Sequence, residues 1–560
     1  MIRPHFRLRR PWWLPVLPVL LLALTGCPGA RQSADLLVYN ATVYPVDSTF
    51  SKAEALAVQD GRVVFVGSTA EARQRYAPEQ EVDARGKFIY PGFYDAHCHF
   101  YRYALNSLPS ANLVGTASWS EVLQQLRAQR RKFPQAAWLT GRGWDQNDWP
   151  GKQFPTKDSL DRQFPDVPVF ITRVDGHAAL VNQKALDLAG VTSRTPISGG
   201  VLERDAQGRL TGLLVDNAVD LVSAKVPDPT RPEAVKLLLQ AQQECLALGL
   251  TSLTDAGLEP AQIALIDSLQ KAGQLKLRLS AMISATPANV AYYLKRGPYR
   301  TERLTVNSFK VYADGALGSR GACLLHPYSD RPKQAGFLLS SVKDYRELAR
   351  RLAASPFQMN THAIGDSANR LLLDIYGEVL RGQQDRRWRI EHAQVVSPGD
   401  VAKFARYGIV PSVQPTHATS DMYWAGERLG PERVKTAYAY QDLLRATGRL
   451  ALGSDFPVEY LNPLFGFHAA VARQDAKNFP QGGFQPENAI SREAALRGMT
   501  EWAAWAAFED EQKGTLTPGK WADFVILDQD IMTAPAARLR DVKVLGTYVQ
   551  GERVYGPAAR

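Results

Sequence analysis

The sequence predicts an α/β fold: a (β/α)8 barrel (TIM barrel) with a small β-sandwich domain built from both chain ends and an inserted subdomain after the first barrel strand. Three observations lead to this prediction. Eight apolar runs end in polar or glycine-rich turns, and helical stretches separate most of them. Short strand patterns occur at both chain ends. The gap between the first two apolar runs, from about residue 101 to 245, is too long for one strand-helix unit.

The first 26 residues are predicted to be a lipoprotein signal peptide. A basic stretch, "MIRPHFRLRRPWW", precedes an apolar stretch, "LPVLPVLLLAL", that is too short and too rich in proline to span a bilayer stably. The tetrapeptide "LTGC" resembles a bacterial lipobox, which implies cleavage before Cys27 and lipidation of Cys27. An ordinary secretory signal is the alternative, and Arg9-Arg10 leaves a twin-arginine export route open.

We therefore expect an exported protein, anchored by lipid to the cell envelope and facing an aqueous extracytoplasmic space. Residues 27–34 form the linker in this prediction. Pro28, in place of an aspartate after the cysteine, favours the outer membrane if the host has one. After Cys27 is lipidated, only Cys98, Cys245 and Cys323 remain, so a disulfide framework is not expected.

Residues 35–90 and 510–560 are predicted to form one composite β-sandwich domain. "DLLVYNATVYPVD" and "EALAVQDGRVVFVGS" are typical of short strands, with a turn at Asp60-Gly61. "ADFVILDQD" and "VKVLGTYVQGERVY" repeat this pattern, with a turn at Gly551. Two separate β appendages are the alternative, but they would leave small sheet edges unpaired.

Residues 91–509 are predicted to form the barrel. Its strand candidates are "FIYPGFYDAH", "GLTSLTDAG", "LKLRLSAMIS", "VNSFKVYADG", "FQMNTHAIGD", "WRIEHAQ", "GIVPSVQP" and "RLALGSD". The insertion of about residues 101–245 contains "GRGWDQNDW" and "RVDGHAALVN", and we expect it to cover the barrel mouth.

Side chains that bind metals lie in or at the ends of five of these runs. His97 and His99 end the first run, and residues i and i+2 of a strand point to the same side, so both imidazoles can face one ion. Lys310, His362, His392 and Asp455 occupy the fourth, fifth, sixth and eighth runs. Each alone is open to a structural explanation, such as a helix cap or a hydrogen-bonded core histidine. Together, at the active end of a barrel, they predict a metal site.

The same motifs, in this order, resemble the amidohydrolase superfamily. "PGFYDAHCH", "SFKVYADGALGSRGA", "THAIGDSA", "RIEHAQ", "LGSDFPVE" and "GTLTPGKWADFVILD" look like the amidohydrolase 3 group of YtcJ-like metal-dependent hydrolases, in which N-substituted formamide deformylase is the best-defined activity. The resemblance covers essentially the mature chain.

The resemblance implies a role for each ligand. His97 and His99 match the ligands of the more buried ion, and His362 and His392 match the ligands from the fifth and sixth strands. Lys310 matches a lysine that can be carboxylated to bridge two ions about 3.5 to 4 Å apart. One or two divalent ions are implied, and the imidazole-rich set favours zinc.

The implied reaction is hydrolysis of a non-peptide C–N bond, of the amide type, in a small molecule. Asp455 would bind metal, take a proton from the attacking water and deliver it to the leaving nitrogen. Hydrolysis of esters, lactones or phosphoesters on the same site stays open as an alternative, and a non-catalytic lipid-anchored binding protein is a further one.

Three further residues are predicted to bind substrate: His177, Arg320 and His417, near the same barrel mouth. Each has the alternative of bracing a loop. Trp144 and Asp145 either line the cavity or pack a loop, whereas Cys98, His326 and His468 are interpreted as structural.

Charge argues against a nucleic-acid partner. The chain of 560 residues carries a formal charge of +10, which falls to +6 once the four arginines of the signal peptide are removed. No dense block of lysine and arginine with interleaved aromatic residues suggests a nucleic-acid groove. The expected partners are a small-molecule substrate and, through the anchor, a membrane, while a homodimer is left open.

Overall fold

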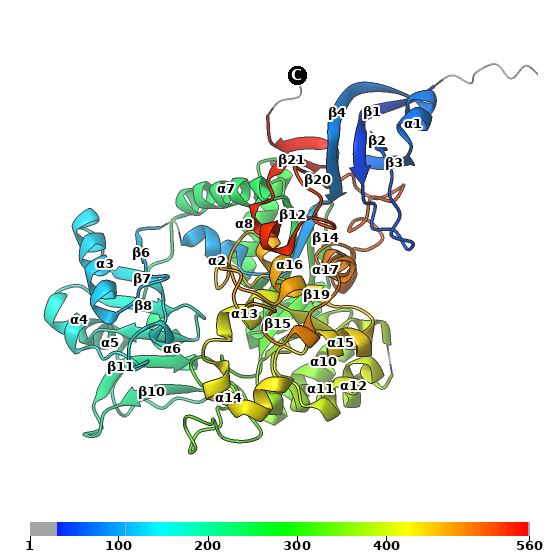
Figure 1. Cartoon of the computed structure of the whole chain (residues 1–560). Coiled ribbons are helices and arrows are strands. Elements are labelled where there is room, and N and C mark those ends of the chain that lie inside the picture. The colour runs from blue at the N-terminus through cyan, green and yellow to red at the C-terminus, as the bar shows by residue number, and fades with distance from the viewer. Residues whose placement is uncertain (1–30, 107, 383, 558–560) are drawn as a thin grey trace, which may run out of the picture.

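The computed structural model describes residues 31–106, 108–382 and 384–557, and these residues form three sheets. Figure 1 shows a central region of strands and helices, a second sheet to one side of it and a third sheet near the chain ends. Residues 1–26 and Cys27, for which a signal peptide and lipidation are predicted, lie outside the described residues. Among the helices of the described residues, none combines the length and apolar character needed to cross a bilayer.

The central sheet is the predicted barrel. Its eight barrel strands are parallel to one another and follow the order β19-β18-β17-β16-β15-β13-β12-β5. The strands are β5 (Phe93–Cys98), β12 (Leu250–Leu258), β13 (Arg278–Ser284), β15 (Leu304–Tyr312), β16 (Gln358–Ala363), β17 (Arg389–His392), β18 (Val410–Val413) and β19 (Ala451–Leu452), with β14 (Tyr299–Arg300) antiparallel to β15. These eight barrel strands coincide with the eight apolar runs, so the predicted barrel is confirmed. Nearly every residue in them is buried, as expected for strands covered on both faces.

The barrel is closed between its first and last strands by backbone contacts at the site end. The amide of Asp455 donates to the carbonyl of His97 at 2.7 Å, and the amide of His99 donates to the carbonyl of Phe456 at 2.8 Å. Gly453 permits this approach, because a Cβ there would lie 2.5 Å from the backbone nitrogen of His97. The closure therefore brings two histidines and an aspartate from opposite ends of the barrel sequence to one place.

Helices surround the barrel, and α10 (Val342–Ala353) shows why such segments are helical. Ser341 caps its N-terminus by accepting from the amide of Asp344, and basic residues occupy its last turn. Tyr345, Ala349 and Leu352 form its buried face. The other helices after β5 outside the insertion are α7 (Arg231–Ala247), α8 (Pro260–Lys271), α9 (Pro287–Arg296), α11 (Asp366–Leu380), α12 (Pro398–Tyr407), α13 (Pro415–Asp421), α14 (Ala425–Arg433), α15 (Tyr440–Thr447), α16 (Pro463–Ala472), α17 (Arg492–Gly498) and α18 (Glu501–Ala506).

Both chain ends contribute to one sheet of seven strands, in the order β22-β21-β20-β4-β1-β2-β3. Its strands are β1 (Gln32–Val43), β2 (Ala55–Gln59), β3 (Arg62–Gly67), β4 (Tyr76–Pro91), β20 (Phe524–Leu527), β21 (Val544–Val549) and β22 (Glu552–Tyr555), and α1 (Thr69–Arg75) packs beside them. The alternation of β1 is visible in its core contacts, since Leu36 and Val38 enter one apolar cluster and Leu37 enters another. Ile89 of β4 pairs with Ile526 of β20, which joins the two ends of the chain.

The segment between β5 and β12 contains a six-stranded sheet, in the order β10-β11-β9-β8-β7-β6. The strands are β6 (Ser110–Asn112), β7 (Leu139–Trp144), β8 (Val169–Arg173), β9 (Ala178–Val181), β10 (Gly200–Arg204) and β11 (Leu210–Asp216), and the helices that precede α7 in this segment are α2 (Phe100–Leu105), α3 (Trp119–Lys132), α4 (Asp158–Gln163), α5 (Gln183–Ala189) and α6 (Asn217–Ser223). It has an apolar core of its own, which includes Trp144 and Ile171. Figure 1 shows this sheet to one side of the barrel, coloured cyan to green-cyan.

Candidate metal centre

His97, in β5, and His99, directly after β5, present the same ring nitrogen to the barrel mouth. His97 is fully buried, and its Nδ1 lies 2.5 Å from Oε2 of Glu391. Nδ1 of His99 lies 2.9 Å from the carbonyl of Ala256. A carboxylate and a carbonyl only accept hydrogen bonds, so both Nδ1 atoms carry the proton and both Nε2 atoms are left as lone-pair donors when the rings are neutral.

Glu391 is a functional residue that the sequence analysis did not identify. Its side chain is fully buried, and Oε1 lies 2.6 Å from Nε of Arg389. Burial raises the pKa of Glu391, but the charges of Arg389 and His97 outweigh this and hold the pKa below its ordinary value. The carboxylate therefore stays ionised and fixes the tautomer of His97, as the outer partners of metal-binding histidines do.

Asp455 faces these bare nitrogens. Its Oδ1 lies 3.1 Å from Nε2 of His99 and 3.6 Å from Nε2 of His97. Burial lowers the pKa of His97 to about 4, and, although burial alone would raise the pKa of Asp455, contacts with the surrounding histidines hold it well below 3.8. Lone pairs on nitrogen thus face lone pairs on a carboxylate at short range. This arrangement is repulsive on its own and fits a cation between the donors.

Lys310 reaches the same point from β15. Its Nζ lies 3.1 Å from Nε2 of His97, and its side chain is 99% buried. Burial lowers the pKa of Lys310 to about 8, while the charges of Glu391 and Asp455 oppose the shift. A substantial share of this amine is therefore neutral near pH 8, which is the form that adds carbon dioxide.

Two further histidines, His392 and His417, form a second group around the carboxylate of Asp455. Nδ1 of His392 donates to Oε1 of Gln414 at 2.8 Å, and Nε2 of His417 lies 3.7 Å from Oδ2 of Asp455. The ligand atoms of His392, His417 and Asp455 lie within 4.8 Å of one another, as do those of His97, His99 and Asp455. Asp455 is common to both groups, and His417, predicted to bind substrate, lies at ligand distance.

His362 lies beside these groups rather than inside them. Its ring is 4.4 Å from that of His392 and 4.9 Å from that of His177, centroid to centroid. Its Nε2 is buried without a hydrogen bond and points toward Asp314, 3.7 Å from Oδ1. Burial holds the pKa values of His362 and His392 well below 6.5, so both rings are neutral and each has a nitrogen lone pair available to a metal ion.

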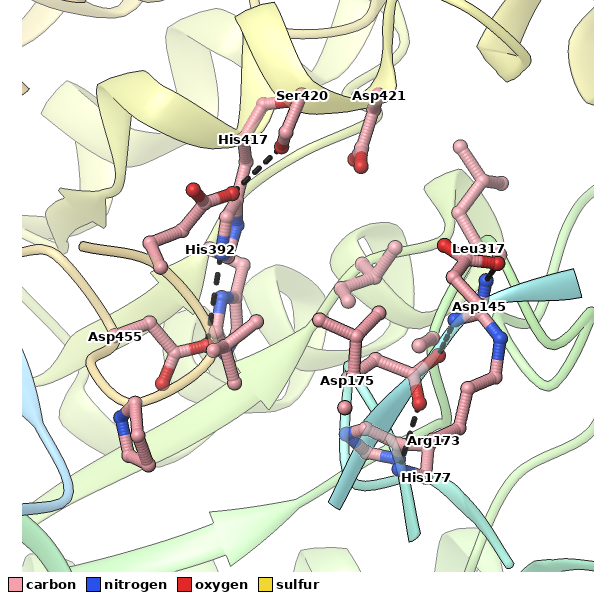
Figure 2. A pocket seen from close by; sticks show the side chains of 18 of the residues that line it. Asp145, Arg173, Asp175, His177, Leu317, His392, His417, Ser420, Asp421 and Asp455 are labelled. Atoms are coloured by element: carbon pink, nitrogen blue, oxygen red, sulfur yellow. Dashed lines mark hydrogen bonds and ion pairs between the residues drawn. The ribbon is translucent and has the colours of Figure 1, made fainter. Parts of the chain in front are cut away.

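A cavity of about 460 Å³ opens over this centre. Figure 2 shows its two walls, with Asp455, His392 and His417 on one side and Arg173, Asp175 and His177 on the other. Most of the predicted site residues line it: His99, His177, Lys310, His362, His392, His417 and Asp455. Its size suits a small molecule.

His177, on the far wall, is held by a carboxylate. Its Nδ1 lies 2.7 Å from Oδ1 of Asp216. Burial alone would lower the pKa of His177, but the hydrogen bond and charge of Asp216 raise it above 6.5. The insertion therefore brings His177 to the site, and Asp216 is a second residue that the sequence analysis missed.

The structure does not bring Arg320 to this cavity. Arg320 has a φ of 64°, and its guanidinium turns away to Asp330, with Nη2 2.7 Å from Oδ2. The arginine that lines the cavity is Arg173, which is buried and pairs with Asp145 and Asp175. The motif "RVDGH", quoted for His177, contains Arg173 and Asp175. The sequence analysis therefore had the motif that contains this cavity-lining arginine but singled out only its histidine.

Other residues named from the sequence lie as follows. Asp145 lines the cavity, whereas Trp144 is buried in the core of the insertion and donates to the carbonyl of Ile171. Cys98 is a free, buried cysteine of the barrel core. His326 uses its carbonyl to accept from Arg433, and His468 is buried on α16.

The donor set fits a divalent metal ion. Burial lowers the pKa values of His97, His362, His392 and His417, a carboxylate supplies negative charge, and Nε2 of His417 is buried without a hydrogen-bond partner. Imidazole and carboxylate together suit zinc and similar first-row ions. The pattern predicted from the sequence is thus brought together around Asp455, with His362 at its side and Arg320 outside it.

Comparison with known proteins agrees with this chemistry. The chain matches the Amidohydrolase family over residues 80–555. It is 34% identical to Protein LONG AFTER FAR-RED 3 of Arabidopsis thaliana, over 94% of this chain and 93% of that one. It is 30% identical to N-substituted formamide deformylase of Arthrobacter pascens, over 93% of this chain and 98% of that one.

A solved structure of a metal-dependent hydrolase is also similar to this chain. An uncharacterized metal-dependent hydrolase from Pyrococcus horikoshii OT3 superposes with a TM-score of 0.72 at 27% identity, covering 90% of this chain and 99% of that chain. The resemblance inferred from the sequence motifs is confirmed by these matches. The protein is a member of the amidohydrolase family of enzymes.

Proposed function

We propose that this enzyme hydrolyses a non-peptide C–N bond, of the amide type, in a small molecule, with the help of one or two divalent ions. The observation that carries the proposal is the approach of two bare imidazole nitrogens to Oδ1 of Asp455, at 3.1 and 3.6 Å. The deformylase relative acts on a C–N bond by its name, which favours amides over esters and phosphoesters.

The proposed ligands divide around Asp455. His97, His99 and Asp455 would hold the more buried ion. His392 would hold a second ion together with His417, whose ligand atoms group with those of Asp455, and with His362, whose ring lies 4.4 Å from that of His392. Carboxylation of Lys310 would supply an anionic bridge in place of an amine that would repel cations. A divalent ion held by these residues, with zinc favoured by their imidazole nitrogens, would polarise a carbonyl group and lower the pKa of water.

Asp455 is the proposed proton carrier. Its pKa is held low, so it is ionised and ready to accept the proton that water loses as its oxygen bonds to the carbonyl carbon. The C–N bond then breaks, and the same carboxyl group returns the proton to the leaving nitrogen. His177 and His417 are the proposed substrate contacts, since both line the cavity. Nothing in the geometry supports such a contact for Arg320.

Metal analysis tests the centre directly. We would measure metal per chain in residues 28–560 purified without chelators, in Lys310→Ala, and in a matched control, Lys343→Ala, on the exposed side of α10. About two ions in the parent and the control, but one or none in Lys310→Ala, are expected. One ion per chain in all three proteins would exclude a carboxylated Lys310 that bridges two ions. No metal in the parent after supplementation would overturn the proposal.

A substrate panel tests the reaction. N-substituted formamides and other amides would be assayed against esters, lactones and phosphoesters, with product amine measured directly. Release of amine that depends on metal supports C–N hydrolysis. Turnover of esters or phosphoesters alone would assign the same centre to another bond, and binding without turnover of any class would favour a binding protein.

We also propose that the protein is exported and attached to the cell envelope by a lipid on Cys27. The support is the order of basic, apolar and "LTGC" segments at the start of the sequence.

A further inference from the structure

The inserted sheet supplies a histidine-aspartate pair to the cavity wall that faces Asp455. Nδ1 of His177 lies 2.7 Å from Oδ1 of Asp216, whose side chain has no exposed surface. The acceptor is a carboxylate, so Nδ1 carries the proton, and Nε2 is the ring nitrogen left toward the cavity that His177 lines. Figure 2 shows His177 across the cavity from Asp455.

Asp216 occupies this position with an unfavourable backbone conformation and an unpaired side-chain oxygen. Its backbone has φ 52° and ψ −125°, which is unusual for any residue except glycine. It precedes α6 as the N-cap, a place where aspartate ordinarily accepts from the helix, yet its side chain makes no cap hydrogen bond. Its second oxygen, Oδ2, is buried without a partner. Such costs concentrate at functional positions.

A loop of the barrel makes room for this carboxylate. Gly315 and Gly321 lie in the segment that follows β15, the strand of Lys310. A Cβ at Gly315 would lie 2.3 Å from Oδ2 of Asp216, and a Cβ at Gly321 would lie 2.2 Å from it. Neither glycine has a positive φ, so space for Asp216, rather than backbone conformation, explains the missing side chains.

We propose that Asp216 is a positioning residue that holds Nε2 of His177 against the scissile group of the substrate, on the side opposite Asp455. The insertion then contributes directly to the reaction through His177, and the glycines of the barrel loop serve Asp216. This inference rests on the proposed hydrolytic function.

A double-mutant cycle tests whether Asp216 acts through His177. His177→Ala, Asp216→Ala and the double variant would be compared by kcat and KM on the best amide, with Asp205→Ala, in the exposed β10–β11 turn, as the matched control. Each single variant is expected to lower kcat/KM at least about tenfold, and the double variant to equal His177→Ala alone. Losses that multiply in the double variant would overturn the proposal, as would an unchanged Asp216→Ala.

Gly315→Ala provides a second route if Asp216→Ala folds poorly. The added methyl group displaces the carboxylate without removing it, so activity should fall as in Asp216→Ala and show no further fall in the His177→Ala background. Metal per chain should stay at the parent level in every variant. Loss of metal together with activity would assign Asp216 a structural role and overturn the inference.

A readout without substrate separates this inference from the proposed function. Diethyl pyrocarbonate acylates accessible imidazole nitrogen, and peptide mass analysis follows its rate at His177. The rates are compared at the pH plateau, where His177 is neutral in both proteins, because Asp216 raises the pKa of His177 in the parent. A plateau rate several-fold lower in Asp216→Ala than in the parent supports the pair, even if no amide is hydrolysed and the proposed function fails. Equal rates would overturn the pair itself.

Discussion

Glu391 accepts the Nδ1 proton of His97 at 2.5 Å, although Glu391 and His97 come from the sixth and first strands of the barrel. Both side chains are fully buried, and Arg389 compensates the charge of the carboxylate. The nitrogen of His97 that faces the candidate metal centre is thus set by a residue outside both groups of candidate ligands.

Replacing this carboxylate should therefore weaken metal binding. Glu391→Gln can still accept from Nδ1, but it loses the charge and can present its amide nitrogen instead. We expect metal affinity to fall about 10- to 100-fold, measured by competition with a chromogenic chelator. Glu378→Gln, in an exposed pair with Arg346, is the matched control. Equal affinities for the parent and Glu391→Gln would show that the tautomer is fixed by other means.

Removing the proposed proton carrier should separate metal binding from chemistry. Asp455→Asn keeps the shape of the side chain and leaves the surrounding histidines in place, but an amide cannot accept a proton from water and return it. These histidines are His97, His99, His362, His392 and His417. We expect kcat to fall by at least about 100-fold while part of the metal is retained. Turnover near the parent level would exclude this role, and Asp442→Asn, exposed on α15, controls for the substitution itself.

Carboxylation of Lys310 should depend on pH and on bicarbonate. Because burial lowers its pKa to about 8, the neutral amine gains as the pH rises through that value. Metal-free protein given zinc at pH 8.5 should regain activity faster with bicarbonate than without it, and the benefit should shrink at pH 6.5. Lys310→Ala should not respond to bicarbonate. If bicarbonate does not speed the recovery of activity in the parent either, Lys310 is unmodified.

A buried pair at the opposite end of the barrel should control stability in acid. Glu509 lies 2.8 Å from Lys513 and accepts from Tyr94 and Thr305. Burial raises the pKa of Glu509, but Lys513 and these hydrogen bonds bring it below 4.5. A folded pKa below the unfolded one stabilises the fold above pH 4.5, and this stabilisation is lost as the pH falls through the folded value.

Glu509→Gln should therefore lower the free energy of unfolding by about 3 kcal/mol at pH 7, because Lys513 loses its partner. The difference from the parent should shrink as the pH falls from 4.5 through the lower folded pKa of Glu509, because the carboxyl group is protonated in both states only below that folded value. Urea unfolding at several pH values measures it. A difference that is constant with pH would contradict the assignment.

The lipid anchor remains a prediction from the sequence, and fractionation tests it. The parent, expressed in a bacterial host with its own first 26 residues, should enter the membrane fraction and incorporate labelled palmitate. Cys27→Ala should do neither. An unlabelled parent in the soluble extracytoplasmic fraction would indicate an ordinary secretory signal.

The barrel and most of the candidate ligands gathered at its mouth could be predicted from the sequence, because each of these side chains lies in or next to an apolar strand run. Glu391 could not, for a geometric reason. Neighbouring residues in a strand point to opposite faces, so a pattern that assigns His392 to the site assigns Glu391 away from it. A positive φ of 75° at His392 breaks the alternation and lets both side chains reach the centre.

The substrate residues were less predictable because their positions depend on loops. His177 follows β8 of the inserted sheet, whereas Arg320 lies in the segment after β15 of the barrel, and the sequence predicted both to bind substrate. Asp216 holds His177 in the cavity wall, whereas Asp330 holds Arg320 away from it. These partners are 39 and 10 residues distant in sequence, and no local pattern identifies them.

The closure of the barrel through Asp455 and His97 also bears on how the enzyme assembles. These residues are joined backbone to backbone, yet nearly the whole catalytic chain must be synthesised between the first and the second. Neither the strands before β19 nor those after β5 hold a complete set of donors alone. We therefore expect these residues to capture a metal ion late in folding, and an ion held by His97, His99 and Asp455 would join the first strand of the barrel to the last.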